Sequence, residues 1–274
     1  MAASPPGLNQ MADVLITIAR MWVQADKAAL DGLRLLARRI DCRSRGLTQS
    51  NRERLRQFDD PRNVARLLTL PEHLRDLARK QPVTQPAALQ MQTALAIAIL
   101  LAAPIRLRNL AGLRLGEHIV RTGRGASQMV RLVIEGDQTK NHEPLDHPLP
   151  VETARLLDLY LASYRPLLLR GADDGALFPG GGAKSKNLLG QQIQKVIRSH
   201  TGLVVHTHLF RHLAGKLSLQ VDPGNFEQVR RLLGHRSIDT TTLFYTGFAT
   251  DAAARRYHEQ VLRPEPAATG TSRS

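Results

Sequence analysis

The sequence predicts a mainly α-helical fold that contains one small antiparallel β-hairpin or sheet. Aromatic residues make up only 4% of the 274 residues although 42% are hydrophobic, so the core must be built from leucine, alanine, isoleucine and valine. That composition favours helices over a sheet sandwich. Over most of the chain the apolar residues recur at helical spacing, and only residues 129–134 and 145–149 have strand-like patterns.

Three helical segments are expected in the first part of the chain. Apolar residues recur at helical spacing over residues 11–23 and again over residues 30–40. Asp60 and Pro61 are a good N-cap and N1 pair for a third helix. Pro71 should interrupt that helix, which then restarts.

The second part of the chain is expected to hold the main core. Residues 87–103 are apolar on nearly all sides, as a buried helix requires. The two strand-like segments flank a polar turn and form the predicted hairpin. The spacing of apolar residues predicts five further helices, at residues 151–170, 186–200, 207–220, 225–233 and 239–245.

A proline-containing linker at residues 81–86 separates two predicted domains. Residues 8–80 form the first, a helical domain, and residues 86–262 form the second. Residues 263–274 are rich in proline, alanine, serine and threonine, and we expect them to form a loose C-terminal tail.

The charge of the chain points to a polyanionic partner. The net charge is +14 and the pI is near 10.9, which favours nucleic acid first and an anionic membrane second. Between residues 34 and 56, eight arginines stand against Asp41 and Glu53, a local charge of +6. We expect this segment to contact the DNA backbone, with a solvated helix face as the alternative. The eight arginines are Arg34, Arg38, Arg39, Arg43, Arg45, Arg52, Arg54 and Arg56.

Several other classes of protein are disfavoured. Cys42 is the only cysteine, so an intrachain disulfide and a cysteine-based zinc site are ruled out, as suits a reducing cytosol. No signal peptide is recognisable, and the apolar run at residues 94–103 is too short to span a bilayer. The metalloprotease, P-loop and serine-hydrolase motifs are missing, so we expect neither a metal nor another cofactor.

Arg106 and the pair His208 and Arg211 are the first candidate site residues. Arg106 follows the buried helix at an abrupt break, where it is either a helix-end charge or a guanidinium aimed into a cleft that binds two phosphate oxygens. His208 and Arg211 are three residues apart on a predicted helix and share one face. The alternative is a solvated polar face, but the apolar neighbours of this pair argue against it.

Two further candidates lie near the C-terminus. Gly234 fits the position after a helix end and presents His235 beyond it, either to an anion or to the helix dipole. Tyr245 is ordinarily a core residue. It becomes a nucleophile where neighbouring groups stabilise its anion, because an unperturbed phenol titrates near about 10.

In this order these residues resemble the catalytic domain of the tyrosine recombinases, the phage-integrase family, over roughly residues 86–262. His-Leu-Phe-Arg-His at 208–212 and Leu-Leu-Gly-His-Arg-Ser-Ile-Asp-Thr-Thr at 232–241 match the two C-terminal boxes of the family. Ile-Arg-Leu-Arg-Asn-Leu-Ala-Gly-Leu at 105–113 matches the first arginine box, and Lys140 matches the lysine of the β-hairpin. Asn109 stands where the family often has an acid, and Tyr245 follows His235 by ten residues where nine is common.

The resemblance implies a site-specific DNA recombinase or integrase that cleaves DNA through a 3′-phosphotyrosyl intermediate. Tyr245 would be the nucleophile, with Tyr257 as the only other candidate. Arg106, Arg211 and His235 would bind the phosphate, Lys140 would protonate the leaving oxygen, and His208 would move the tyrosine proton.

The resemblance also implies a helical DNA-clamping domain before residue 81, no ATP or metal cofactor, and a homo-tetramer on paired sites of double-stranded DNA. It suggests a cytoplasmic, nucleoid-associated bacterial enzyme, which we assign to a mobile element. A type IB topoisomerase and a catalytically silent DNA-binding protein on the same fold are the alternatives. The DNA target sequence cannot be read from the chain, because abundant arginines report phosphate contacts rather than base readout.

Overall fold

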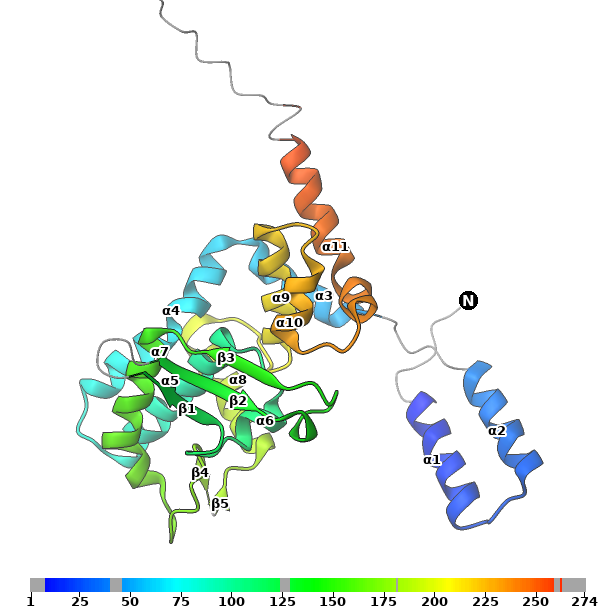
Figure 1. Cartoon of the computed structure of the whole chain (residues 1–274), viewed down its shortest axis with the longest axis horizontal. Coiled ribbons are helices and arrows are strands. Elements are labelled where there is room, and N and C mark those ends of the chain that lie inside the picture. The colour runs from blue at the N-terminus through cyan, green and yellow to red at the C-terminus, as the bar shows by residue number, and fades with distance from the viewer. Residues whose placement is uncertain (1–7, 40–45, 124–128, 181, 259–261, 263–274) are drawn as a thin grey trace, which may run out of the picture. The chain divides into compact units, whose positions relative to one another are not determined.

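The first compact unit is a pair of helices. The computed structural model describes residues 8–39, 46–123, 129–180, 182–258 and 262, and the chain divides into two units between Gly46 and Leu47. In the first unit α1 (Leu8–Met21) packs against α2 (Lys27–Arg39), as Figure 1 shows. Two helices cannot enclose a core by themselves: α2 buries no residue, and Trp22 is 87% exposed.

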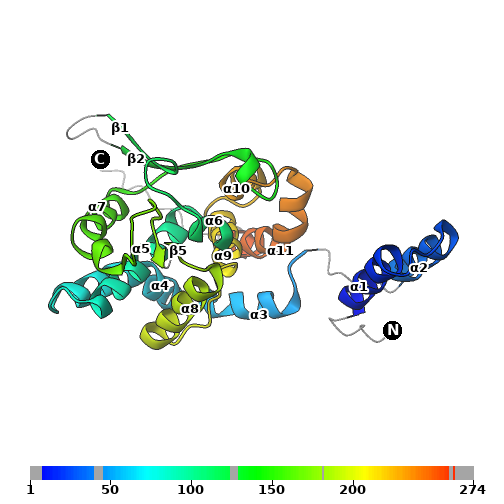
Figure 2. The ribbon, with the colours of Figure 1, turned by 90° about the horizontal axis from the view of Figure 1, so that it is seen from below.

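The second unit begins earlier than the sequence predicts. It includes α3 (Gln49–Arg56) and α4 (Pro61–Arg79), which the domain prediction assigned to residues 8–80. Helix α4 packs along α5 (Gln85–Ala102), as Figures 1 and 2 show. Residues 81–86 therefore connect two helices that belong to the same compact unit, and the division into two domains at this linker stays a prediction.

Helix α4 starts where the sequence predicts but does not break at Pro71. Asp60 caps it, because the carboxylate accepts a hydrogen bond of 2.9 Å from the backbone N–H of Arg62. Pro71 lies inside the continuous helix and is buried. The buried Leu67, Leu70 and Leu74 pack α4 into the core, and this packing outweighs the backbone hydrogen bond that a proline cannot make.

Helix α5 is the central core element, as predicted. Twelve of its eighteen residues are buried, and it contacts α4, α7 (Val151–Leu159) and α8 (Lys186–Thr201). By length and apolar composition it is the one helix among the described residues that is able to cross a membrane. Because 67% of it is buried inside the protein, core packing accounts for this composition.

The predicted hairpin is confirmed and belongs to a three-stranded antiparallel sheet. Strand β2 (Met129–Ile134) pairs on one side with β3 (Leu145–Pro148) and on the other with β1 (Ile119–Thr122). The register aligns Ile134 with Leu145 and Ile119 with Leu132. Strand β1 was not predicted from the sequence, because a four-residue strand with one buried side chain shows almost no alternation of apolar and polar residues.

The remaining helices follow the prediction with two differences. The predicted helix at 151–170 is α-helical only to Leu159 and continues as a π turn and a 3-10 turn to Leu168. The predicted helix at 239–245 extends over twenty residues, so Tyr245 lies inside a helix rather than at its end. The last helices of the chain are α8, α9 (Leu209–Val221), α10 (Phe226–Leu233) and α11 (Ile238–Tyr257), and a short β4 (Pro179–Gly180) and β5 (Gly182–Ala183) precede them.

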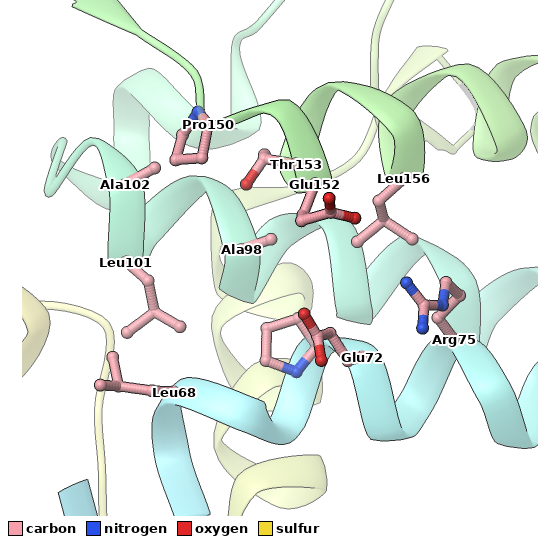
Figure 3. A pocket seen from close by; sticks show the side chains of 11 residues that line it. Leu68, Glu72, Arg75, Ala98, Leu101, Ala102, Pro150, Glu152, Thr153 and Leu156 are labelled. Atoms are coloured by element: carbon pink, nitrogen blue, oxygen red, sulfur yellow. The ribbon is translucent and has the colours of Figure 1, made fainter. Parts of the chain in front are cut away.

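A cavity of about 250 Å³ opens between α4, α5 and α7. Figure 3 shows Leu68, Leu101 and Leu156 in its wall beside the side chains of Glu72 and Arg75. The wall combines apolar groups with charges of both signs. It therefore lacks the uniformly positive lining that a phosphate site requires, and the predicted site lies elsewhere.

Candidate active site

All six residues predicted to be catalytic line one cavity of about 450 Å³. They come from five places: the N-cap of α6 (Leu107–Ala111), the loop between β2 and β3, the start of α9, the turn after α10, and α11. Helices α9, α10 and α11 pack on one another (Figure 1). The described lining residues include four cationic side chains and no carboxylate. The twelve are Arg106, Lys140, Asn141, His142, His208, Arg211, His212, His235, Arg236, Thr240, Phe244 and Tyr245.

Arg211 is the most firmly held cation of the cavity. It is 3% exposed, and its guanidinium donates 2.6 Å hydrogen bonds to the carbonyl oxygens of Pro104 and Leu233. Burial, and then the charge of Arg106, lowers the pKa of Arg211 to about 10. At neutral pH it therefore remains a cation in a fixed orientation.

The hydrogen-bond partner of Arg106 is not the residue at position 109, where the family often has an acid. Its Nη2 donates to Oδ1 of Asn141 at 3.0 Å, and burial lowers its pKa. Asn109, which replaces the acid often found in the family, instead donates to the backbone oxygen of Gln138 at 3.1 Å. The amide of Asn141 thus takes the supporting place, and no local pattern signals it, since it lies 35 residues from Arg106 in the sequence.

Tyr245 is 1% exposed and lies in the wall of the cavity. Its hydroxyl lies 3.2 Å from Nδ1 of His212 and 3.5 Å from the backbone oxygen of Arg211, the two groups within reach of its single proton. The ring packs so closely on Gly215 that a Cβ there would approach it to 2.8 Å. Burial raises the pKa of Tyr245, while the charge of Arg211 opposes that rise. The phenol is therefore protonated and tightly packed.

His235 follows Gly234, which caps α10 with a left-handed φ of +58°, as predicted. Its Nδ1 lies 2.9 Å from the hydroxyl of Thr241, which leaves Nε2 as the ring nitrogen for a phosphate oxygen. Its ring is nearly parallel to that of Tyr245, at 8°. The site thus places a histidine directly beside the tyrosine.

His212 is the histidine that contacts the phenol, and the sequence reading gave it no role. No hydrogen bond joins His208 to Tyr245 among the described residues. The ring of His208 instead meets His212 edge-on, with centroids 4.7 Å apart. The only sequence signal for His212 is its place directly after Arg211 in the motif.

Lys140 is exposed and reaches the cavity from the loop between β2 and β3. Of the eight N-terminal arginines, the three that belong to the second unit, Arg52, Arg54 and Arg56, do not line this cavity. Arg52, Arg54 and Arg56 are exposed on α3, and Arg52 and Arg56 line a different pocket, between α3, α9 and α11. The other arginines divide between two groups: Arg34, Arg38 and Arg39 are exposed on α2 of the first unit, and Arg43 and Arg45 lie outside the described residues.

One of these arginines is already paired. Arg34 forms an ion pair of 2.8 Å with Asp31, so the charge of this arginine is partly neutralised by a carboxylate.

Among the described residues, no group of three or more histidine, cysteine or acidic side chains is arranged to hold a metal ion.

His212 and His235 predict that the protein loses stability in mild acid. His212 is 4% exposed and His235 is half-buried. Burial, followed by neighbouring positive charge, lowers the pKa of His212 to about 3 and that of His235 to about 4. An unfolded histidine titrates near about 6.5, so between pH 6.5 and 4 the unfolded chain binds more protons than the folded one. The free energy of unfolding therefore falls as the pH falls through this window.

We expect the Tm to be several degrees lower at pH 5 than at pH 7.5, since each kcal/mol lost lowers the Tm by about 2–4 °C. Differential scanning fluorimetry measures this. His212→Asn, which does not titrate, should reduce the dependence of Tm on pH. An unchanged dependence in that variant would show that burial of His212 does not disfavour its protonation.

Known proteins resemble this chain in sequence. The model of the phage integrase family matches residues 66–250. The chain is 28% identical to tyrosine recombinase XerD of Proteus mirabilis over 211 residues, which are 73% of this chain and 63% of that protein. It is 29% identical to XerD of Yersinia pestis over 222 residues, 76% of this chain and 69% of that protein.

A solved structure shares the fold. The XerH site-specific recombinase, bound to its palindromic difH substrate in a post-cleavage complex, superposes with a TM-score of 0.52 at 20% identity. The match covers 69% of this chain and 50% of the XerH chain, so the protein spans about half the length of that recombinase. Because the family model covers more than half of the chain, the protein belongs to the phage integrase family of tyrosine recombinases.

Proposed function

We propose that this protein is a site-specific DNA recombinase that cleaves and rejoins DNA through a 3′-phosphotyrosyl intermediate. The observation that carries the proposal is the cavity itself, where a buried tyrosine lies among arginine, lysine and histidine side chains with no carboxylate in the described lining. Such a lining favours a phosphodiester, because its charge matches the anion and its arginine forks match the phosphate oxygens.

The chemistry follows from the groups present. The oxygen of Tyr245 forms a bond to the scissile phosphorus, and the bond from phosphorus to the 5′-oxygen breaks. Arg106, Arg211 and His235 bind the non-bridging oxygens and stabilise the charge that they gain in the transition state. Lys140 gives a proton to the leaving 5′-oxygen, which departs as a hydroxyl.

The proton of the phenol leaves through His212. This histidine lies 3.2 Å from the hydroxyl and contacts the ring of His208, so the two provide a route from the buried tyrosine towards the open part of the cavity. One phosphodiester is exchanged for another, and the reverse step with a different 5′-hydroxyl joins new partners. The exchange needs no ATP, because the phosphotyrosine bond retains the free energy of the broken phosphodiester bond.

The proposal extends to the assembly, the DNA contacts and the location of the enzyme. Exchange of two duplexes breaks four strands, which requires four tyrosines and hence a tetramer on paired sites. The exposed arginines of α2 and α3 would contact the DNA backbone, as the charge of +14 favours. We assign the enzyme to a bacterial mobile element because the family is named for phage integration, and we place it in the cytoplasm with the nucleoid.

A pool of nicked duplexes with randomised sequence tests the function without knowledge of the target. A nick just downstream of a cleavage point lets the short leaving strand diffuse away, so that the covalent adduct accumulates. We expect an SDS-resistant adduct on a subset of sequences, whose recovery identifies the site. Trypsin places Tyr245 and Tyr257 in different peptides, so mass spectrometry of the adduct identifies the attacked residue.

The results separate the alternatives. Adducts on a narrow set of sequences, with the nucleotide on the peptide that carries Tyr245, support recombination. Efficient relaxation of supercoiled plasmid without sequence preference would favour a type IB topoisomerase. DNA binding without any adduct would favour a catalytically silent DNA-binding protein.

A further inference from the structure

Asn141 connects two parts of the active site that lie far apart in the sequence. Its Oδ1 accepts a hydrogen bond of 3.0 Å from Nη2 of Arg106. Its Nδ2 donates a hydrogen bond of 2.9 Å to the backbone oxygen of Gly234, the residue before His235. One half-buried side chain next to Lys140 therefore contacts the start of the first arginine box and the turn after α10.

The chemistry of the partners fixes how this amide is oriented. A guanidinium only donates hydrogen bonds and a backbone oxygen only accepts them, so a single amide orientation satisfies both contacts. Aspartate lacks the donor and leucine lacks both groups. Asparagine is thus one of the few side chains of this length that makes this bridge.

The other side of the same loop is also anchored. The amide of Asn109 donates to the backbone oxygen of Gln138 at 3.1 Å, and the side chain of Gln138 lies 2.9 Å from Nε2 of His118. The hydroxyl of Thr139 lies within hydrogen-bond distance of two backbone oxygens of the loop, those of Gly136 at 3.0 Å and Glu143 at 2.9 Å, which share its single proton. Lys140 lies between these contacts and those of Asn141.

The hairpin of β2 and β3 packs against the turn that carries His235. Leu145, at the start of β3, lies so close to Gly234 that a Cβ on Gly234 would approach its side chain to 2.5 Å. The hydrogen bond from Asn141 to the oxygen of Gly234 adds a directional contact to this packing. The loop is therefore held on two faces, by α6 and by the turn after α10.

We propose that Asn141 is a positioning residue that places Lys140 at the leaving 5′-oxygen by fixing its loop to Arg106 and to Gly234. The inference rests on the proposed function, because it assigns Lys140 as the proton donor. Lysine side chains are long and flexible, and a fixed loop reduces the volume that the ammonium group explores. The amide of Asn141 touches neither the phosphate nor the tyrosine in this role.

The test compares two leaving groups. The duplex recovered from the randomised pool is prepared with either oxygen or sulfur at the 5′-bridging position of the scissile phosphate. A sulfur leaving group needs no proton donor, because thiols titrate near about 8.5, far below alcohols. A defect in proton donation therefore appears with oxygen and disappears with sulfur.

We expect Asn141→Ala to slow cleavage of the oxygen substrate by about 10- to 100-fold, in line with the loss of two hydrogen bonds, one of them to a charged group. On the sulfur substrate its rate should lie within about threefold of the wild-type rate, because a sulfur leaving group does not depend on the proton that Lys140 gives. Lys140→Ala should show the same pattern with a larger loss. Asp137→Ala changes an exposed residue of the same loop and should match the wild type on both substrates.

Two results would overturn the inference while leaving the proposed function intact. Asn141→Ala that is equally slow on both substrates would show that the amide acts through Arg106 or the fold and not through Lys140. Asn141→Ala that cleaves the oxygen substrate at the wild-type rate would show that the bridge is dispensable. A wild-type protein that forms no adduct at all would overturn the proposed function, and this inference with it.

Discussion

Replacing Tyr245 by phenylalanine should reduce the covalent adduct below detection, a loss of more than about 10⁴-fold, as expected when the attacking atom itself is removed. The fold should be retained, because phenylalanine keeps the ring that packs on Gly215 and lies parallel to His235. The lost hydroxyl makes only hydrogen bonds of 3.2 and 3.5 Å. SDS gel electrophoresis after incubation with the nicked duplex pool measures the adduct, and a filter-binding assay measures retained DNA affinity.

Tyr257→Phe is the matched control for this substitution. Tyr257 lies on the same helix, is 53% exposed, and is absent from the lining of the cavity. Its variant should form the adduct at the wild-type level. The assignment would be reversed if the adduct persisted in Tyr245→Phe and disappeared in Tyr257→Phe.

Arg211→Lys should reduce single-turnover cleavage by about 100- to 1000-fold, comparable to the loss of one preorganised donor to a developing oxyanion. The guanidinium fork binds the oxygens of Pro104 and Leu233 together and leaves further N–H groups for the phosphate. A single ammonium cannot make this set of contacts. We also expect the free energy of unfolding to fall by about 1–3 kcal/mol, because a buried carbonyl loses its partner.

Rapid quench with the recovered duplex measures the rate, and urea titration followed by circular dichroism measures the stability. Arg155→Lys tests the same chemical change at an exposed position on α7, where Arg155 pairs with Glu152 at 2.9 Å. Such a surface pair contributes about 0–1 kcal/mol, so this control should retain both rate and stability. A rate within threefold of wild type for Arg211→Lys would contradict the assigned role.

The sequence was most informative where a property depends on neighbouring residues. The all-round apolar helix α5, the hairpin of β2 and β3, and the glycine cap at Gly234 were all predicted because their patterns are local. The candidate residues Arg106, Arg211 and Tyr245 were identified from short motifs, and the structure brings them to one cavity. Their roles in catalysis remain predictions.

The features that the sequence did not reveal depend on contacts between distant segments. The unbroken α4 at Pro71 and the division at Gly46 follow from packing of α4 on α5, which no local pattern describes. Asn141 contacts groups that lie 35 and 93 residues away in the sequence. His212 is the last residue of the His-Leu-Phe-Arg-His motif, but the tyrosine whose phenol it contacts lies 33 residues further along the chain.

Two arginines of the cavity, Arg106 and Arg211, have a consequence for the stability of the whole molecule. The charge of Arg106 contributes to lowering the pKa of Arg211, which means that the two cations repel each other in a poorly hydrated space. Folding must hold them there before any phosphate arrives, and a phosphate placed between them relieves the repulsion. Under the proposed function, substrate binding and folding are therefore thermodynamically linked, and DNA in the cavity would stabilise the same arrangement that it needs for reaction.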